Sequence, residues 1–176
     1  MKSPQRKETN VGLDMYLYAS KHLADYEWMK DEEREEFRAV KKAAGIDTSD
    51  LESEIGPMGR SGSVTVCVGY WRKANAVHGW FVRECGGGKD DCSEIFVTRG
   101  NLSRLAKICE HLVSSRDAKL AGEILPPTEG FFFGTYEIDD FYWEDVANTV
   151  SIINSALSKF PEDEKRPVSF SYQASW

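Results

Sequence analysis

The chain has 176 residues, of which 41% are hydrophobic and 29% charged, a balance that predicts one ordinary globular domain. Its formal charge at pH 7 is −7, and no basic run is longer than two residues. Direct binding to DNA or RNA is therefore disfavoured, because such proteins gather lysine and arginine against the phosphates. No apolar stretch is long enough to span a bilayer and no secretory leader opens the chain, so we expect no membrane partner and a cytoplasmic protein.

The amino-terminal part begins with a polar segment and continues with a segment in which apolar and polar residues alternate. Residues 1–10 are polar and lack periodicity, so we expect a disordered extension that precedes a single α+β domain over residues 11–176. Leu13, Met15 and Leu17 then alternate with acidic and tyrosine positions. This period of two residues predicts a half-buried first strand.

The next segment predicts a helix, a loop and a strand. An apolar stripe of helical period over residues 25–44 predicts an amphipathic helix that ends at a glycine. At about residues 46–63 the chain is rich in Gly, Ser, Asp and Glu, which predicts a long loop. Alternating valines over residues 64–70 predict the second strand.

Residues 70–81 are the most informative stretch, because they set a cation, an amide and an imidazole among aromatic residues. If the stretch is helical, Trp71, Asn75 and His78 lie on one face. That face, with Lys73 beside it, is suited to a planar or anionic ligand, or else to a polar network that fixes the helix to a sheet. A histidine among aromatic residues is more often a buried hydrogen-bond partner than a catalytic base.

The four cysteines are too few and too irregularly spaced for a disulfide scaffold. Cys85 and Cys92 follow His78 at even spacing, but zinc sites generally use tighter pairs of ligands. We therefore expect reduced thiols, no metal and no cofactor. Residues 93–97 predict another short strand, and Thr98 is a suitable cap for the helix that follows.

The carboxyl-terminal part predicts two further strands and a long helix. The aromatic residues 130–136 favour a strand, residues 140–157 carry a buried helical stripe, and residues 168–173 alternate like a strand. Asp139 and Asp140 fall in the first turn of the long helix, where carboxylates complement the amide dipoles. We thus expect an α+β fold, with a mostly antiparallel sheet of about five strands and about four helices largely on one face.

Four motifs give the chain a resemblance to a group of uncharacterised phage and prophage proteins: GLDMYL at residues 12–17, YWRKANAVH at residues 70–78, GFFFG at residues 130–134 and YQASW at residues 172–176. The resemblance covers nearly all of the chain from Val11, where members of the group start with Met. It implies a phage origin, and hence the cytoplasm of a bacterial host. It implies no biochemical activity and no catalytic residue.

The sequence contains no phosphate-binding loop, nucleophile elbow or paired-cysteine zinc pattern, which favours a binding protein over an enzyme. Our preferred hypothesis is a phage accessory protein that counters host defence by sequestering a signalling nucleotide or by inhibiting a host protein. One alternative is a small hydrolase or transferase acting on a nucleotide, with His78 as acid or base and Lys73 steadying phosphate charge. The other is an acidic mimic of nucleic acid that inhibits a DNA-binding complex.

The expected partner is a small anionic or nucleotide-like ligand, or a host protein, and homo-oligomerisation stays open. The candidate ligand-binding residues come from two clusters of aromatic and polar side chains that the fold could bring together: Trp71, Lys73, Asn75, His78, Tyr136, Asp139, Asp140 and Tyr142. Metal-dependent nuclease chemistry could also use carboxylates that hold magnesium, although their spacing does not require it: Asp14, Glu137, Asp139 and Asp140.

Overall fold

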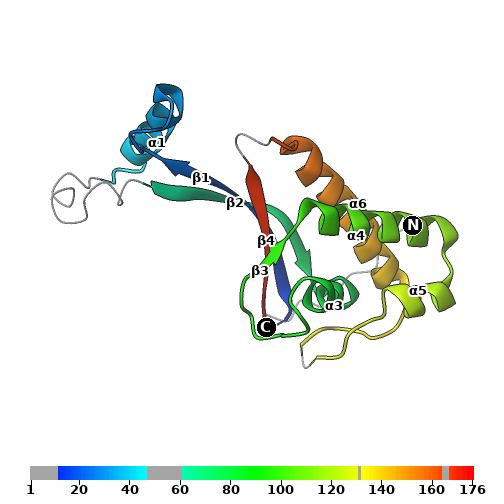
Figure 1. Ribbon diagram of the computed structural model, residues 1–176. Coiled ribbons are helices and arrows are strands. Elements are labelled where there is room, and N and C mark those ends of the chain that lie inside the picture. Colours follow the sequence, from blue (N-terminus) through cyan, green and yellow to red (C-terminus); the bar gives the residue numbers. More distant parts are fainter. Residues whose placement is uncertain (1–11, 47–60, 131, 164–166) are drawn as a thin grey trace.

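The structure is a computed structural model that describes residues 12–46, 61–130, 132–163 and 167–176. Over these residues the chain has an α+β fold with one antiparallel sheet of four strands, in the order β2-β1-β4-β3, and five helices (Figure 1). The predicted extension at residues 1–10 and most of the predicted loop at residues 46–63 lie outside the described residues. The elements in chain order are β1 (Asp14–Ala24), α1 (Asp31–Ala43), β2 (Ser61–Arg72), α3 (Asn75–Glu84), β3 (Ile95–Val97), α4 (Arg99–Ser115), α5 (Ala118–Ile124), α6 (Asp140–Lys159) and β4 (Val168–Ser175).

The first strand carries the alternation that the sequence predicts. Leu13, Met15 and Leu17 are completely buried, whereas Tyr16 and Tyr18 lie on the other face and are half-buried. Because β1 pairs with β2 on one side and with β4 on the other, its side chains form the middle of the sheet. The prediction of a half-buried first strand is confirmed.

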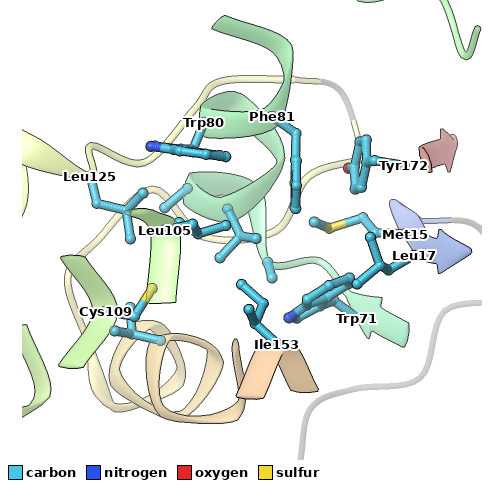
Figure 2. Packing of buried hydrophobic residues seen from close by; sticks show 14 of the residues in the cluster. Met15, Leu17, Trp71, Trp80, Phe81, Leu105, Cys109, Leu125, Ile153 and Tyr172 are labelled. Atoms are coloured by element: carbon cyan, nitrogen blue, oxygen red, sulfur yellow. The ribbon is translucent and has the colours of Figure 1, made fainter. Parts of the chain in front are cut away.

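Helices α3, α4, α5 and α6 lie on one side of the sheet, with α5 packed against α4 at the end farthest from the strands (Figure 1). Their apolar stripes meet the sheet in a core to which Leu105 of α4 and Ile153 of α6 contribute from the helices and Trp71 from β2 (Figure 2). The rings of Phe81 on α3 and Tyr172 on β4 stack with their centroids 4.2 Å apart. Burying one such large side chain contributes about 1.5–3 kcal/mol, so this core holds the helices on the sheet.

The aromatic residues 130–136 do not form a strand, and that prediction is wrong. Apart from residue 131, which is not described, the chain here makes turns and irregular loop. The side-chain amide of Asn75 donates to the carbonyl groups of Phe133 and Thr135, and Gly134 takes a left-handed φ of 91°. An amide side chain thus satisfies backbone groups that a neighbouring strand would otherwise have to satisfy. The described sheet therefore has four strands, one fewer than expected.

The described helices number five, one more than expected, because the sequence analysis did not include α5. Asp117 caps α5, since its carboxylate accepts hydrogen bonds from the N–H groups of Lys119 and Leu120. With only seven residues, α5 is too short to show a full apolar period. The predicted cap of α4 is confirmed, because Thr98 accepts from the N–H of Asn101.

The predicted helix at residues 71–81 begins later than expected. β2 extends past Trp71, and α3 begins at Asn75. Between them Lys73 turns the chain with a left-handed φ of 60°, and its N–H donates to the carbonyl of Leu13 at 2.7 Å. The alternation of β2 thus continues through Trp71. The prediction that Trp71 shares a helix face with Asn75 and His78 is wrong.

β1 and β2 reach beyond β4. The pairing of β1 with β4 ends where Lys21 faces Val168, whereas the pairing of β1 with β2 continues to Ala24 opposite Ser61. Helix α1 lies on this projecting end, away from the other helices (Figure 1). None of the residues of α1 is fully buried, so polar contacts must help to hold it. We call the projecting end the arm: residues 22–24, residues 61–63 and α1.

Asp25 anchors α1 to the arm. Its carboxylate is 10% exposed and accepts hydrogen bonds from Nε of Arg34 at 2.6 Å and from Nε of Arg38 at 2.8 Å. Burial opposes ionisation of this carboxyl group, but the hydrogen bonds from Arg38 and Arg34 outweigh burial and lower the pKa of Asp25 below its usual value. An ion pair of 2.6 Å between Lys21 and Glu36 adds a second link.

We expect Asp25→Asn to loosen α1 and to lower the local free energy of unfolding by about 1–3 kcal/mol, because the amide loses the negative charge and places an NH2 donor where one carboxylate oxygen accepts from Arg34 or Arg38. Since the pKa of Asp25 is lowered on folding, its contribution is present above the ordinary pKa of aspartate, about 4, and is lost as the pH falls through the lower folded value. Hydrogen exchange of residues 31–43 measures both effects. The control is Asp31→Asn, since the side chain of Asp31 is 91% exposed and its contact with Arg34 is long, at 3.4 Å, and therefore weak. Unchanged exchange over α1 in Asp25→Asn would contradict the anchor.

Candidate functional site

The structure places the predicted site residues in three different surroundings. Trp71 is buried beneath α6, where its indole N–H donates to Oγ1 of Thr149 at 2.9 Å. Asn75 and His78 lie in buried hydrogen-bond networks on α3. The others surround the start of α3 and the start of α6: Lys73, Tyr136, Asp139, Asp140 and Tyr142.

Asn75 fixes the loop between α5 and α6 to α3. Its Nδ2 donates to the carbonyl of Phe133 at 3.0 Å and to that of Thr135 at 2.7 Å, and its Oδ1 accepts from the N–H of Thr128 at 3.2 Å. The residue is only 5% exposed. Both ends of the amide are therefore used inside the fold, and the role as a network partner explains Asn75 without a ligand.

A crevice at the start of α3 is the place where the two predicted clusters meet. Lys73 and the first turn of α3 line one side, and Glu137, Tyr142 and Asp145 line the other. Its volume is about 10 Å³, which is room for about one water molecule. Sites for nucleotide-sized ligands generally have several hundred cubic ångströms, so this crevice does not admit a nucleotide in the form seen here.

The acidic and tyrosine residues near α6 have roles in local structure. Asp139 caps α6 by accepting from the N–H of Tyr142 at 3.0 Å, and Asp140 is exposed in the first turn. The hydroxyl of Tyr142 donates to the carbonyl of Leu125 at 2.9 Å. Tyr136 bonds within its own loop through its hydroxyl group. These contacts account for Asp139, Tyr142 and Tyr136 as a cap and loop supports, and the first-turn position accounts for Asp140.

His78 is the middle member of a buried polar chain. Its Nδ1 lies 2.7 Å from the hydroxyl of Tyr172, and its Nε2 lies 3.0 Å from Oδ2 of Asp90. Burial raises the pKa of Tyr172 well above its usual value, so the phenol keeps its proton and can donate to Nδ1. The tautomer with hydrogen on Nε2 then donates to Asp90 and satisfies both contacts.

The hydrogen-bonded series Tyr172–His78–Asp90 is oriented unfavourably for nucleophilic catalysis. In a catalytic triad of nucleophile, histidine and carboxylate, the nucleophile meets the substrate and the carboxylate is the buried member. Here Tyr172 is 1% exposed, whereas the side chain of Asp90 is 32% exposed. The rings of Phe133 and Trp176 lie edge-on to His78 with centroids 5.0 and 5.4 Å away. The arrangement therefore supports packing of α3 on β4 better than acid or base chemistry.

The sheet face opposite α3–α6 carries aromatic residues that the sequence analysis did not select. The ring centroid of Tyr16 is 6.1 Å from that of Tyr18 and 5.4 Å from that of Tyr70. The hydroxyl of Tyr70 donates to Asp14. In the described part of the chain, Oγ of Ser171 on this face is buried without a hydrogen-bond partner. Alternation within a strand does not reveal which face the helices will cover, so the sequence could not distinguish this face from the covered one.

An open groove lies between α1, the paired strands β1 and β2, and the end of α6. It consists of three adjoining hollows of about 170, 570 and 460 Å³. Val64 and Val66 form part of its floor and are 39% and 44% exposed. We call it the α1–α6 groove, after the elements that supply much of its apolar lining: Phe37, Val40, Val64, Val66, Phe160 and Val168.

The described charged residues that line the α1–α6 groove are all basic: Lys21, Arg38, Lys41, Lys42 and Lys159. Arg38 and Lys21 also bond to carboxylates of Asp25 and Glu36. Lys42 and Lys159 are exposed, one on α1 and the other at the end of α6. In a chain with a net charge of −7, the groove is thus an apolar surface with a basic rim.

Among the described residues, none of the helices is both long enough and apolar enough to cross a membrane. In the same part of the chain, no group of three or more His, Cys, Asp and Glu side chains is arranged to hold a metal ion. The four cysteines are free thiols, and Sγ of Cys85 accepts from Nδ2 of Asn101 at 3.1 Å. Comparison with models of protein families, with curated proteins and with solved structures finds no match to this chain. The site is therefore interpreted from its own geometry.

The bond between His78 and Tyr172 is tested by a double-mutant cycle. We expect His78→Phe and Tyr172→Phe each to lower the free energy of unfolding by about 1–3 kcal/mol, because each leaves a buried polar partner unpaired. The double variant should cost less than the sum of the two, by on the order of 1 kcal/mol. Chemical denaturation measures all four proteins. Tyr136→Phe is the control, since its hydroxyl bonds elsewhere and its effect should add to that of His78→Phe. Simple additivity of the His78 and Tyr172 variants would show that the bond contributes nothing.

Proposed function

We propose that this protein acts by binding another protein, and that the α1–α6 groove receives an apolar, acidic segment of that partner. The observation that carries the proposal is the groove itself, an uncovered apolar surface whose described charged residues are all basic. With the resemblance to phage proteins, the proposal becomes a phage accessory protein that inhibits a host protein in the bacterial cytoplasm.

The apolar floor supports a macromolecular partner. Val64 and Val66 are uncovered although they lie on the helix-covered side of the sheet, between α1 and the end of α6. Contiguous apolar surface flanked by charged groups is typical of protein interaction sites, because covering it removes apolar area from water. A segment with alternating or helically spaced apolar residues would fill the space that the helices leave open.

The charge pattern supports an acidic partner. Lys42 and Lys159 lie at opposite parts of the groove, so acidic residues on both sides of an apolar segment would each meet a cation. Such complementarity speeds association and excludes basic segments. A nucleic-acid mimic would instead need a row of carboxylates, and the groove presents the opposite sign of charge.

Sequestering of a nucleotide has less support than inhibition of a protein. The crevice beside Lys73 has room for about one water molecule, and both ends of the Asn75 amide are engaged in the fold. A hydrolase or transferase would need an accessible acid or base, whereas His78 is 1% exposed and bonded through both ring nitrogens.

Reversal of the two exposed cations tests the proposal. Partners captured from a bacterial lysate are identified by cross-linking mass spectrometry, purified, and titrated calorimetrically against each variant. Lys42→Glu with Lys159→Glu should weaken binding by about 5-fold to 30-fold, equivalent to about 1–2 kcal/mol, with the fold intact because both side chains are exposed.

The matched control is Lys107→Glu with Lys119→Glu, which makes the same change in net charge at exposed positions of α4 and α5. This control should retain the affinity of the original protein. Equal loss of affinity in both double variants, or cross-links that all lie outside the groove, would overturn the proposal.

A further inference from the structure

β2 is the outer strand of the sheet, and over the described residues it pairs only with β1. Its 12 residues therefore leave the backbone N–H and C=O groups of alternate residues pointing away from the sheet. The opposite edge is different, because β3 has only three residues. One edge of this sheet is thus long and open, and the other is short.

The open edge lacks the features that usually prevent strands from pairing. Residues 61–71 contain no charged residue and no proline. The register shows a single bulge, at Val68, since Leu17 faces Gly69 whereas Tyr18 faces Cys67. Residues 61–67 precede this bulge and pair regularly with β1. They form an uninterrupted edge that can accept another strand.

We propose that residues 63–67 of β2 pair in antiparallel register with the same residues of a second copy of this chain, about a two-fold axis at Thr65. Two residues lie directly opposite one another when they are equally distant from this axis. In an antiparallel pair, such opposite residues point to the same face of the sheet. Val64 then lies opposite Val66 of the partner subunit, and Ser63 opposite Cys67 of the partner subunit. The apolar side chains of the edge meet on one face, and the small polar side chains meet on the other.

Charge does not oppose the pairing of two copies at this edge. Two copies that each carry a net charge of −7 repel one another over most of their surfaces, but this edge brings no charge opposite a charge. The alternation of valine with serine, threonine and cysteine is complementary to itself, so no other strand is needed to match it.

The symmetry has a consequence for the groove. A two-fold axis perpendicular to the sheet keeps the helix-covered faces of both copies on the same side. The two sheets then join into one continuous sheet, and both α1–α6 grooves open on one face of the dimer. This inference goes beyond the proposed function: Val64 and Val66 belong to both surfaces, but Lys42 and Lys159 do not lie on the β2 edge, so the two sets of variants test the two surfaces separately.

Sedimentation velocity at increasing protein concentration tests the dimer. The full chain should convert from monomer to dimer. Thr65→Lys alone and Thr65→Glu alone should stay monomeric, because each places like charges opposite one another at the axis. An equimolar mixture of the two variants should form the dimer again, which also shows that both variants are folded.

Ser169→Lys is the matched control. Thr65 and Ser169 are both exposed hydroxyl residues bonded to Ser20, one on the edge strand β2 and the other on the interior strand β4. This control should dimerise like the original protein. A monomer at every concentration, undiminished dimer in Thr65→Lys, or a mixture that fails to restore the dimer would each overturn the inference. Loss of the groove's partner without loss of the dimer would count against the proposed function alone.

Discussion

The unequal lengths of the two neighbours of β1 determine the shape of this protein. β4 covers β1 only as far as Lys21, whereas β2 accompanies it to Ala24. Beyond that point the sheet has two strands, and two strands alone are marginally stable in water. Helix α1 packs on them through polar anchors such as Asp25 with Arg34 and Arg38. The arm and the α1–α6 groove both follow from this difference in length.

Buried polar groups in the rest of the fold are mostly engaged with one another. Asn75 satisfies three backbone groups of one loop, and His78 links Tyr172 to Asp90. Unpaired groups at these depths would cost about 1–3 kcal/mol each, so such networks position α3 and the loop uniquely. A cluster of polar and aromatic residues in the sequence can thus mark the places where a fold is fixed. The uncovered surfaces of this molecule are instead formed by valines and tyrosines on strands, which no sequence motif distinguishes.

Local patterns in the sequence predicted much of the fold. Alternation identified β1 and β4, and Thr98 was recognised as the cap of α4. The α+β class, the antiparallel sheet and helices largely on one face are likewise confirmed. Prediction failed where a distant residue decides: the amide of Asn75 withdraws Phe133 and Thr135 from any sheet, and Lys73 in a left-handed conformation delays α3. The groove could not be predicted, because its walls come from segments far apart in the chain. A local pattern of apolar residues does not say how far apart such segments lie in the fold.

The register of β1 and β4 also bears on how the protein is made. Asp14 lies opposite Ser175, which follows it by 161 residues, so the central strand is synthesised well before its second neighbour. Until β4 emerges, β1 has one unpaired edge, and the buried side chains of Phe170 and Tyr172 are missing from the core. Nascent chains paused before Val168 would expose this edge to pairing with other strands. Premature termination there would leave an open sheet at its centre, a more severe defect than the loss of a terminal strand at an edge.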